Sequence, residues 1–266
     1  MAGDIEAMFH LSGYDPPRAI ERIVPDGSIN IVIELDGQER FVVPADESAS
    51  EQRCVASWIS GVHQRPISIR VPNGSELIAI RFATGRAHPF LGVPLSELTD
   101  KVIPARDVVG DSIATIRNQA IAAADSSEKL SLVADWLEAQ KSTEHIPPPA
   151  LTTAVDQIRA RPTVATLADL HSDVGVSSTH LVTLFRRYVG VRPKQLQRIL
   201  RFASVFATLS AEGSSPNTID WSRVSVDCGY YDQSHLIRDF SHFSGFRPSE
   251  FLDRGDNRLN FFPIEE

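Results

Sequence analysis

The sequence predicts an α+β protein with a small β-barrel and accompanying helices in its N-terminal half and an all-α C-terminal domain. Three observations lead to this fold class. Short runs of β-branched and aromatic residues occupy the first hundred residues, amphipathic helical spacing follows them, and the last hundred residues carry one helical motif twice. A chain of 266 residues is long enough for two domains, each with its own core.

The β-type runs of the N-terminal half lie at Ile29–Leu35, Arg40–Val43, Val55–Val62, Ile67–Val71 and Glu76–Phe82. Asp36-Gly37 and Asn73-Gly74 separate neighbouring runs, and both dipeptides are strong signals for hairpin turns. Several short strands at this spacing favour a small barrel or a sandwich.

Residues 107–141 change to helical spacing. Two apolar stripes follow one another: Ile113, Ile116, Ala120 and Ile121, then Leu130, Val133, Trp136 and Leu137. Asp125-Ser-Ser-Glu128 between them is typical of a helix cap. The stripes suit a dimer surface, and they suit packing on the β domain equally well. The segment His145-Ile-Pro-Pro-Pro149 then predicts a stiff, extended linker.

The first copy of the repeated motif has the features of a helix-turn-helix unit. Its first helix is predicted from the spacing of Val164, Leu167, Leu170 and Val174. Gly175 suits the position after a helix end, where a positive φ is required, and Ser177 suits the N-cap of the next helix. That second helix has Leu181, Leu184, Phe185 and Tyr188 on one face. Gly190 ends it, and Pro193 begins another helix that runs unbroken to about residue 211.

The second copy repeats this order. Trp221, Val224 and Cys228 line a short helix, Gly229 ends it, and Asp232 is the expected N-cap. Leu236, Phe240 and Phe243 form the buried face of the helix that follows. Six positions of the first copy recur after a shift of 55 residues, from His180 on His235 to Pro193 on Pro248.

Together the two units resemble the DNA-binding domain of the AraC/XylS family of bacterial transcription regulators, over about residues 150–253. In the first unit the resemblance rests on Gly175-Val-Ser-x-x-His-Leu-x-x-Leu-Phe185-Arg-Arg-x-x-Gly190-Val-x-Pro193. In the second unit it rests on Cys228-Gly-Tyr-Tyr-Asp-Gln-Ser-His-Leu-Ile-Arg-Asp-Phe240 and Gly245-x-x-Pro248-Ser-Glu-Phe251. His171 departs from the family, which usually has a small alanine there, and it predicts a slightly opened or rotated first unit.

The resemblance implies a transcription regulator that is not an enzyme and uses no cofactor. We expect an effector-binding or dimerisation domain at residues 1–143, a Pro-rich linker at 144–150 and a DNA-binding domain at 151–255. Double-stranded DNA is the implied partner, and RNA polymerase, a small-molecule effector and a second copy of the chain are further candidates. Neither the effector nor the direction of regulation follows from the sequence.

The N-terminal half resembles, more loosely, the domains that precede such DNA-binding domains. The phrases Ile23-Val-Pro-Asp-Gly-Ser28 and His88-Pro-Phe-Leu-Gly-Val-Pro-Leu-Ser-Glu-Leu98 carry this resemblance, which implies a cupin-like barrel. A metal-binding cupin needs clustered histidines and a carboxylate, whereas His10, His63 and His88 are scattered, so we expect no metal. Trp58, Phe82 and Phe90 suit a small-molecule pocket, but aromatic residues on strands more often belong to the core.

The charge of the chain is unevenly distributed. Residues 1–150 hold 13 Lys and Arg against 21 Asp and Glu, a net charge of −8, whereas residues 151–266 hold 13 of each and are neutral. Residues 178–201 contain six Lys and Arg and no acidic residue. We expect a local basic surface there, and local charge matters more than net charge for contact with phosphates.

In this motif the N-terminal turn of the second helix enters the major groove. The residues expected to contact bases are therefore Thr179, Val182 and Thr183 in the first unit and Gln233, Ser234, Ile237 and Arg238 in the second. Arg suits guanine and Gln suits adenine, whereas Val and Ile offer only apolar contact. The residues expected to contact phosphates are Ser177, Arg186, Arg187, Arg192, Lys194 and Arg247. For His180 and His235, packing beside the apolar face is at least as good an expectation as base contact.

Cys54 and Cys228 are too few for a disulfide framework, and the sequence shows neither a signal peptide nor a long apolar run. We therefore expect a cytoplasmic protein. Two alternatives to a regulator stay open: a cupin-type metalloenzyme fused to a DNA-binding module, and an interaction protein whose helix-turn-helix units no longer bind DNA.

Overall fold

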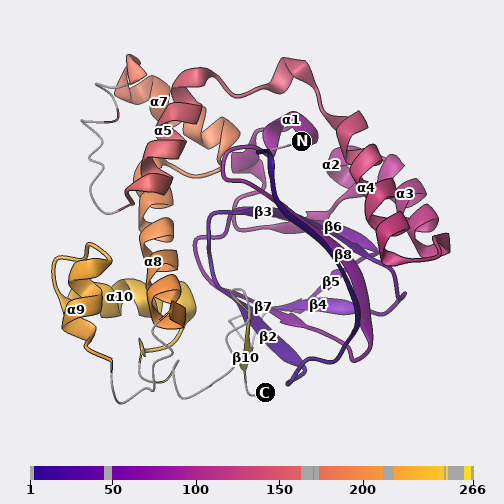
Figure 1. Ribbon diagram of the computed structural model, residues 1–266, viewed down its shortest axis with the longest axis horizontal. Helices are drawn as coiled ribbons and strands as arrows, with labels where there is room; N and C mark the ends of the chain where they lie inside the picture. The colour runs from indigo at the N-terminus through magenta and orange to yellow at the C-terminus, as the bar shows by residue number, and fades with distance from the viewer. Residues whose placement is uncertain are drawn as a thin grey trace.

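The structure is a computed structural model of an α+β protein, with antiparallel sheets in the N-terminal half and helices in the C-terminal half (Figure 1). It describes residues 3–44, 50–162, 170, 174–211, 219–248, 250 and 261–264. The predicted α+β class is confirmed. Val164, Leu167 and His171 of the first unit lie outside the described residues.

The described strands form two five-stranded antiparallel sheets. The first has the order β1 (Ile5–Tyr14), β8 (Ser75–Phe82), β3 (Ile29–Glu34), β6 (Ser57–Ser60) and β9 (Val102–Pro104). The second has the order β10 (Phe261–Ile264), β2 (Ile20–Ile23), β7 (Ile67–Arg70), β4 (Arg40–Val43) and β5 (Gln52–Cys54). Alternate residues of the central strands, such as Ile31 on β3 and Ile80 on β8, are fully buried because one face of each strand meets the core.

Two expectations about the β domain are corrected. The described strands do not close into a barrel, because β1 and β9 remain the edges of the first sheet. The two predicted hairpins are also wrong. Asp36-Gly37 joins β3 to β4, and Asn73-Gly74 joins β7 to β8, so each turn connects strands of different sheets. Both glycines do adopt a positive φ.

Helices cover the ends and one side of the β domain (Figure 1). They are α1 (His88–Leu91), η1 (Leu95–Glu97), α2 (Arg106–Val109), α3 (Ser112–Ala122), α4 (Ser126–Gln140) and η2 (Thr143–His145). Asp125 caps α4 as predicted, since its carboxylate accepts from the Glu128 N–H at 2.9 Å. The apolar stripes of α3 and α4 pack into the core of the β domain, with the exception of Ile121, which is exposed. The sequence left two roles open for these stripes, a dimer surface and packing on the β domain, and the structure shows packing on the β domain.

The aromatic residues of the β domain belong to its interior. Trp58, Phe82 and Phe90 are all buried, and the rings of Phe82 and Phe90 lie 5.2 Å apart between centroids. The expectation that these residues form core is therefore confirmed.

The C-terminal helices are α5 (Pro149–Ala160), α7 (Ser178–Tyr188), α8 (Pro193–Ala211), α9 (Trp221–Asp227) and α10 (Gln233–Ser244). Helix α8 is continuous over 19 residues, as the absence of Gly and Pro predicted. The segment expected as an extended linker is shorter than predicted, because η2 includes His145 and α5 begins at Pro149, where a missing N–H costs nothing.

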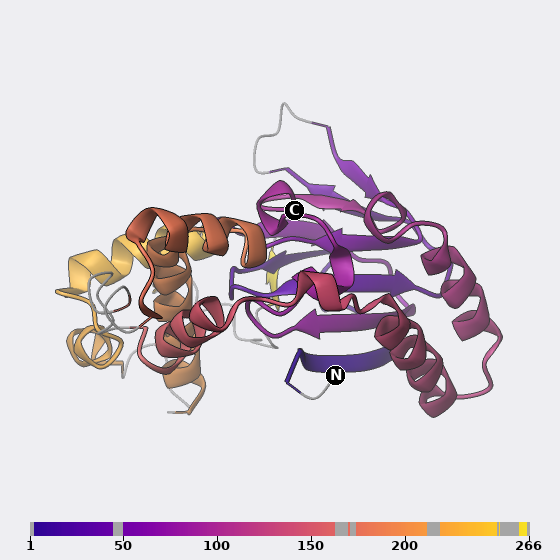
Figure 2. The ribbon, with the colours of Figure 1, turned by 90° about the horizontal axis from the view of Figure 1, so that it is seen from above.

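One hydrophobic cluster joins the two halves of the chain. A Cβ added to Gly85 would lie 3.4 Å from a methyl carbon of Val155 on α5, and one added to Gly27 would lie 3.1 Å from Leu196 on α8. Strand β10, which the sequence did not predict, brings the C-terminal segment back to pair with β2 (Figure 1). Figure 2 shows the helical half beside the sheets, with the segment between α4 and α5 running along the β domain.

Candidate nucleic-acid interface

Both repeated motifs contain the predicted turn and cap. Gly175 and Gly229 have φ values of 66° and 67°, which lie in the left-handed region that favours glycine. The Ser177 hydroxyl accepts from the His180 N–H at 3.3 Å, and the Asp232 carboxylate accepts from the His235 N–H at 2.7 Å. Each cap satisfies a backbone donor that the helix leaves free, so α7 and α10 begin at fixed positions.

The apolar faces of α7 and α10 are packed into the helical domain. Leu181 and Phe185 of α7 are fully buried, as are Leu236 and Phe240 of α10. Phe202 of α8 contacts the second unit, with its ring centroid 5.5 Å from that of Phe240. The opposite faces of both helices are therefore the ones presented to solvent.

All seven residues expected to contact bases lie on these outer faces. Val182 and Ile237 are half-buried; Thr179, Thr183, Gln233, Ser234 and Arg238 are exposed. The Thr183 hydroxyl donates to the Thr179 carbonyl at 3.0 Å, and Arg238 Nε donates to the Ser234 carbonyl at 3.3 Å. The hydrogen bond from Nε orients the Arg238 side chain along the helix.

The six residues expected to contact phosphates are all exposed: Ser177, Arg186, Arg187, Arg192, Lys194 and Arg247. Arg187 lies 5.7 Å from the ring centroid of Tyr188, a cation–π distance that holds the guanidinium near the end of α7. The Arg247 N–H donates to Glu250 at 2.9 Å. Four of these cations lie within nine residues: Arg186 and Arg187 in the last turn of α7, and Arg192 and Lys194 after it. The basic surface is therefore concentrated at the C-terminal end of α7.

Two of the six cations in residues 178–201, Arg198 and Arg201, make contacts within the helical domain. Arg198 on α8 forms an ion pair with the buried Asp239 on α10 at 2.7 Å, and it lies 5.4 Å from the ring centroid of Phe243. Arg201 lies 5.5 Å from the ring centroid of Tyr230. These contacts fix α10 against α8, which corrects the expectation that the whole run forms an outer basic surface.

The two units are connected by α8 (Figure 1). The second helices of the two units, α7 and α10, are called the recognition helices below. Helix α7 precedes α8 in the chain, and α10 packs against the first half of α8, where Arg198 pairs with Asp239 and Phe202 lies against Phe240.

His180 and His235, which the sequence places beside the apolar faces of α7 and α10, differ in exposure. His235 lies edge-on to Tyr230 at 5.2 Å between centroids, which supports its packing role, whereas His180 is exposed. His88 is fully buried between His145 and Tyr188, and this burial lowers its pKa. Within the described ranges, no three His, Cys, Asp or Glu residues are grouped in a way that could hold a metal ion.

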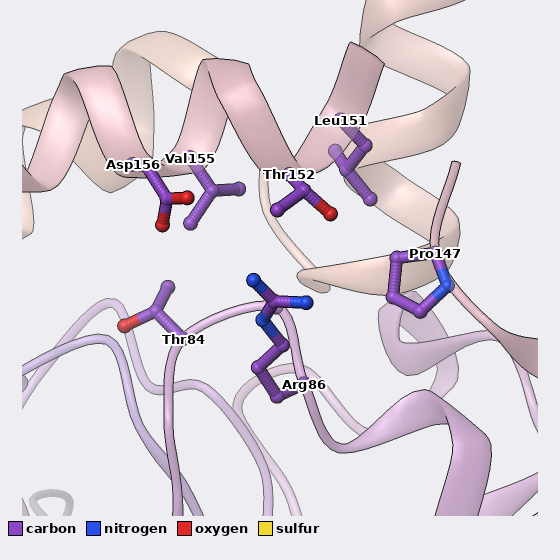
Figure 3. Close-up of a pocket in the computed structure, with 8 residues that line it drawn as sticks. Thr84, Arg86, Pro147, Leu151, Thr152, Val155 and Asp156 are labelled. Carbon is purple, nitrogen blue, oxygen red and sulfur yellow. The ribbon is translucent and has the colours of Figure 1, made fainter. Parts of the chain in front are cut away.

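A small recess separates the β domain from α5 (Figure 3). Its lining includes Thr84 and Arg86 on one side and Leu151, Thr152 and Asp156 of α5 on the other, and its empty volume is about 170 Å³. This volume includes space open to solvent, and the recess encloses no cavity that could hold a small molecule. We therefore assign no effector to this recess. No helix among the described residues is both long and apolar enough to span a membrane.

The turn glycines Gly175 and Gly229, the caps and outer polar faces of α7 and α10, and the helix that connects the units have the order that two helix-turn-helix units require. Comparison with family models agrees. Residues 170–254 match a model described as a helix-turn-helix domain, and residues 1–104 match one described as a domain of unknown function (DUF6597). The resemblance to AraC/XylS regulators is thereby confirmed for the C-terminal part: residues 170–254 form a helix-turn-helix domain of the AraC type.

Solved structures of ToxT from Vibrio cholerae are distantly similar. A 1.65 Å structure of ToxT is 10% identical with a TM-score of 0.47, and the match covers 94% of this chain and 98% of that one. ToxT from Vibrio cholerae O395 is 12% identical with a TM-score of 0.47, covering 92% and 95%. Wild-type ToxT with bound unsaturated fatty acid is 10% identical with a TM-score of 0.45, covering 92% and 93%. A search of the curated proteins finds no match to the chain.

Proposed function

We propose that the chain is a sequence-specific DNA-binding regulator of transcription that places α7 and α10 in successive segments of the major groove. One observation carries this proposal: two capped helices present polar outer faces, and one continuous helix connects the two units. The match of residues 170–254 to a helix-turn-helix domain supports DNA binding by the same elements.

The two units would have unequal roles. The outer face of α10 carries Gln233 and Arg238, whose side chains can form paired hydrogen bonds to adenine and guanine respectively. The outer face of α7 carries Thr179, Val182 and Thr183, which discriminate bases less sharply. Most of the exposed cations lie at the C-terminal end of α7. We therefore propose that the first unit supplies most of the phosphate contacts and the second unit most of the sequence discrimination.

The phosphate contacts are assigned to exposed side chains at the ends of the recognition helices. Arg186, Arg187, Arg192 and Lys194 surround the C-terminal end of α7, and Arg247 follows α10. The hydroxyl of Ser177 accepts the His180 N–H, so its own hydrogen can donate to a phosphate at the start of α7.

The N-terminal domain would modulate this binding, because it contacts the end of each recognition helix. The Thr99 hydroxyl donates to the carbonyl of Gly190 after α7 at 2.8 Å, and Arg22 on β2 lies 4.6 Å from the ring centroid of Phe246 after α10. A small molecule or a second copy of the chain that changed these contacts would alter the placement of both helices.

The proposal is tested by selecting duplexes of about 30 base pairs from a random library with the full chain and footprinting the selected site. We expect two protected segments about one helical turn apart on one face of the duplex. The logarithm of the association constant should fall linearly with the logarithm of the salt concentration. If the chain selects no sequence and shows no salt-dependent binding, the helix-turn-helix units do not bind DNA and the proposal fails.

A further inference from the structure

Two neighbouring tyrosines in the turn between α9 and α10 have opposite surroundings. Tyr230 is 4% exposed, and it packs edge-on against His235 and beneath Arg201. Tyr231 is 93% exposed, the largest exposed fraction among the exposed large hydrophobic side chains of the described chain. Tyr230 therefore helps to build the second unit, whereas the ring of Tyr231 contributes almost nothing to its packing.

Tyr231 stands at the end of α10 that leads into the groove. It directly precedes the N-cap Asp232, and the next two residues are the exposed Gln233 and Ser234. In a helix-turn-helix protein the N-terminal residues of the recognition helix approach the base edges. A side chain that protrudes beside that N-cap is consequently directed to the same surface as the base-contacting residues.

The sequence neighbours of Tyr231 supply no cation at this end of the helix. The sequence holds no Lys or Arg between Arg223 and Arg238, and Asp227 and Asp232 are both exposed. Carboxylates repel phosphates, so attraction here has to come from an uncharged group. A tyrosine supplies one, because its ring can pack on sugars or thymine methyl groups and its hydroxyl can donate to a phosphate oxygen.

We infer that Tyr231 is a DNA-contacting residue of the second unit, which adds a contact without net charge where α10 enters the major groove. This inference rests on the proposed function. Under this inference the two units bind DNA by different chemistry. The contacts at the C-terminal end of α7 are ionic, so their contribution to affinity falls as salt rises. The contact of Tyr231 at the start of α10 carries no net charge, so its contribution does not depend on salt.

The test compares Tyr231→Ala, Tyr231→Phe and Val226→Ala on the duplex that the wild-type chain selects. Val226 is a matched control, since it lies in the same unit on α9 and is 73% exposed. We expect Tyr231→Ala to weaken binding about fivefold or more at every salt concentration, with an unchanged salt slope. Tyr231→Phe should lose less than Tyr231→Ala, because it keeps the ring, and Val226→Ala should bind like the wild type. All three variants should unfold at the wild-type temperature, since both positions are exposed.

Three results would overturn the inference while the wild type still binds DNA: wild-type affinity of Tyr231→Ala, equal losses in Tyr231→Ala and Val226→Ala, or a reduced salt slope in Tyr231→Ala. If the wild-type chain binds no DNA at all, the proposed function fails first, so the two failures are distinguishable.

Discussion

Gly190, the residue where α7 meets the N-terminal domain, gives the sharpest test of how the two domains are joined. Its φ is 98°, and an added Cβ would lie 3.1 Å from the Leu95 carbonyl oxygen and 3.1 Å from the Thr99 hydroxyl. The same Thr99 hydroxyl donates to the Gly190 carbonyl at 2.8 Å. Gly190→Ala should therefore strain the local backbone and disturb the contact between the domains.

The expected cost has three parts. A non-glycine residue in the left-handed region costs about 1–2 kcal/mol. Weakening the hydrogen bond from Thr99 costs about 0.5–1.5 kcal/mol. Against these, Ala restricts the unfolded chain more than Gly does and recovers about 0.4–1 kcal/mol. We expect Gly190→Ala to lower the free energy of unfolding by about 0.5–3 kcal/mol, measured by urea denaturation.

Gly74→Ala is the matched control. Gly74 also has a positive φ, 69°, but an added Cβ would have no neighbour within 4 Å among the described residues. The control carries only the backbone cost, so the excess loss in Gly190→Ala reports the contact with Leu95 and Thr99. Equal losses in the two variants would refute the assignment of Gly190 to the junction between the domains.

The remaining predictions concern the DNA-binding half and one thiol. Arg238→Ala should relax specificity at one base pair and reduce the binding free energy for the matched duplex by about 1–3 kcal/mol. Arg187→Ala should weaken binding to matched and scrambled duplexes alike and reduce the salt slope by about 1. Fluorescence anisotropy titrations on the matched and the scrambled duplex measure both affinities. If Arg238→Ala loses the same affinity on both duplexes, Arg238 contacts phosphate and not a base. Asp239→Asn should lower the free energy of unfolding in urea by about 1–2 kcal/mol, because the neutral amide that replaces the carboxylate no longer forms an ion pair with the partly exposed Arg198. An unchanged midpoint of unfolding would contradict that role. Burial raises the pKa of Cys54 to about 11, so iodoacetamide at neutral pH should modify this thiol far more slowly in the native chain than in the unfolded chain. Rapid native labelling of Cys54 would show that the site is open.

The sequence was most informative where the structure depends on local signals. The caps at Asp125, Ser177 and Asp232, and the unbroken course of α8, all follow from residues within one or two helical turns. The same signals placed the outer residues of α7 and α10 at the surface, because helical spacing alone divides a buried face from an exposed one.

The sheets depend on pairing between distant segments, and there the local signals misled. Asp36-Gly37 has the composition of a hairpin turn, yet Asp36 instead holds the corner between the sheets. Its carboxylate pairs with Arg40 at 2.6 Å and accepts the Glu76 N–H at 2.6 Å. Strand β10 was missed for the same reason, since its pairing with β2 joins residues more than two hundred positions apart. The ion pair between Arg198 on α8 and Asp239 on α10 also joins residues that are distant in the sequence, so helical spacing alone could not predict it.

The two phrases that carried the weaker resemblance of the N-terminal half turn out to lie at the junction between the domains. Gly27, in the first phrase, lies against Leu196 of α8, and Leu95, in the second, lies against Gly190 after α7. Of these contacts, Leu95 with Gly190 and Arg22 with Phe246 lie at the C-terminal ends of α7 and α10, whose N-terminal ends are exposed. In the proposed binding mode the N-terminal ends of both helices face the bases, so a domain that contacts only the C-terminal ends would change their relative placement without occupying the DNA-contacting surface. Regulation through this domain would therefore change how well the separation of α7 and α10 fits the spacing of the major groove. It would thereby change the affinity for DNA sites that both units must contact at once.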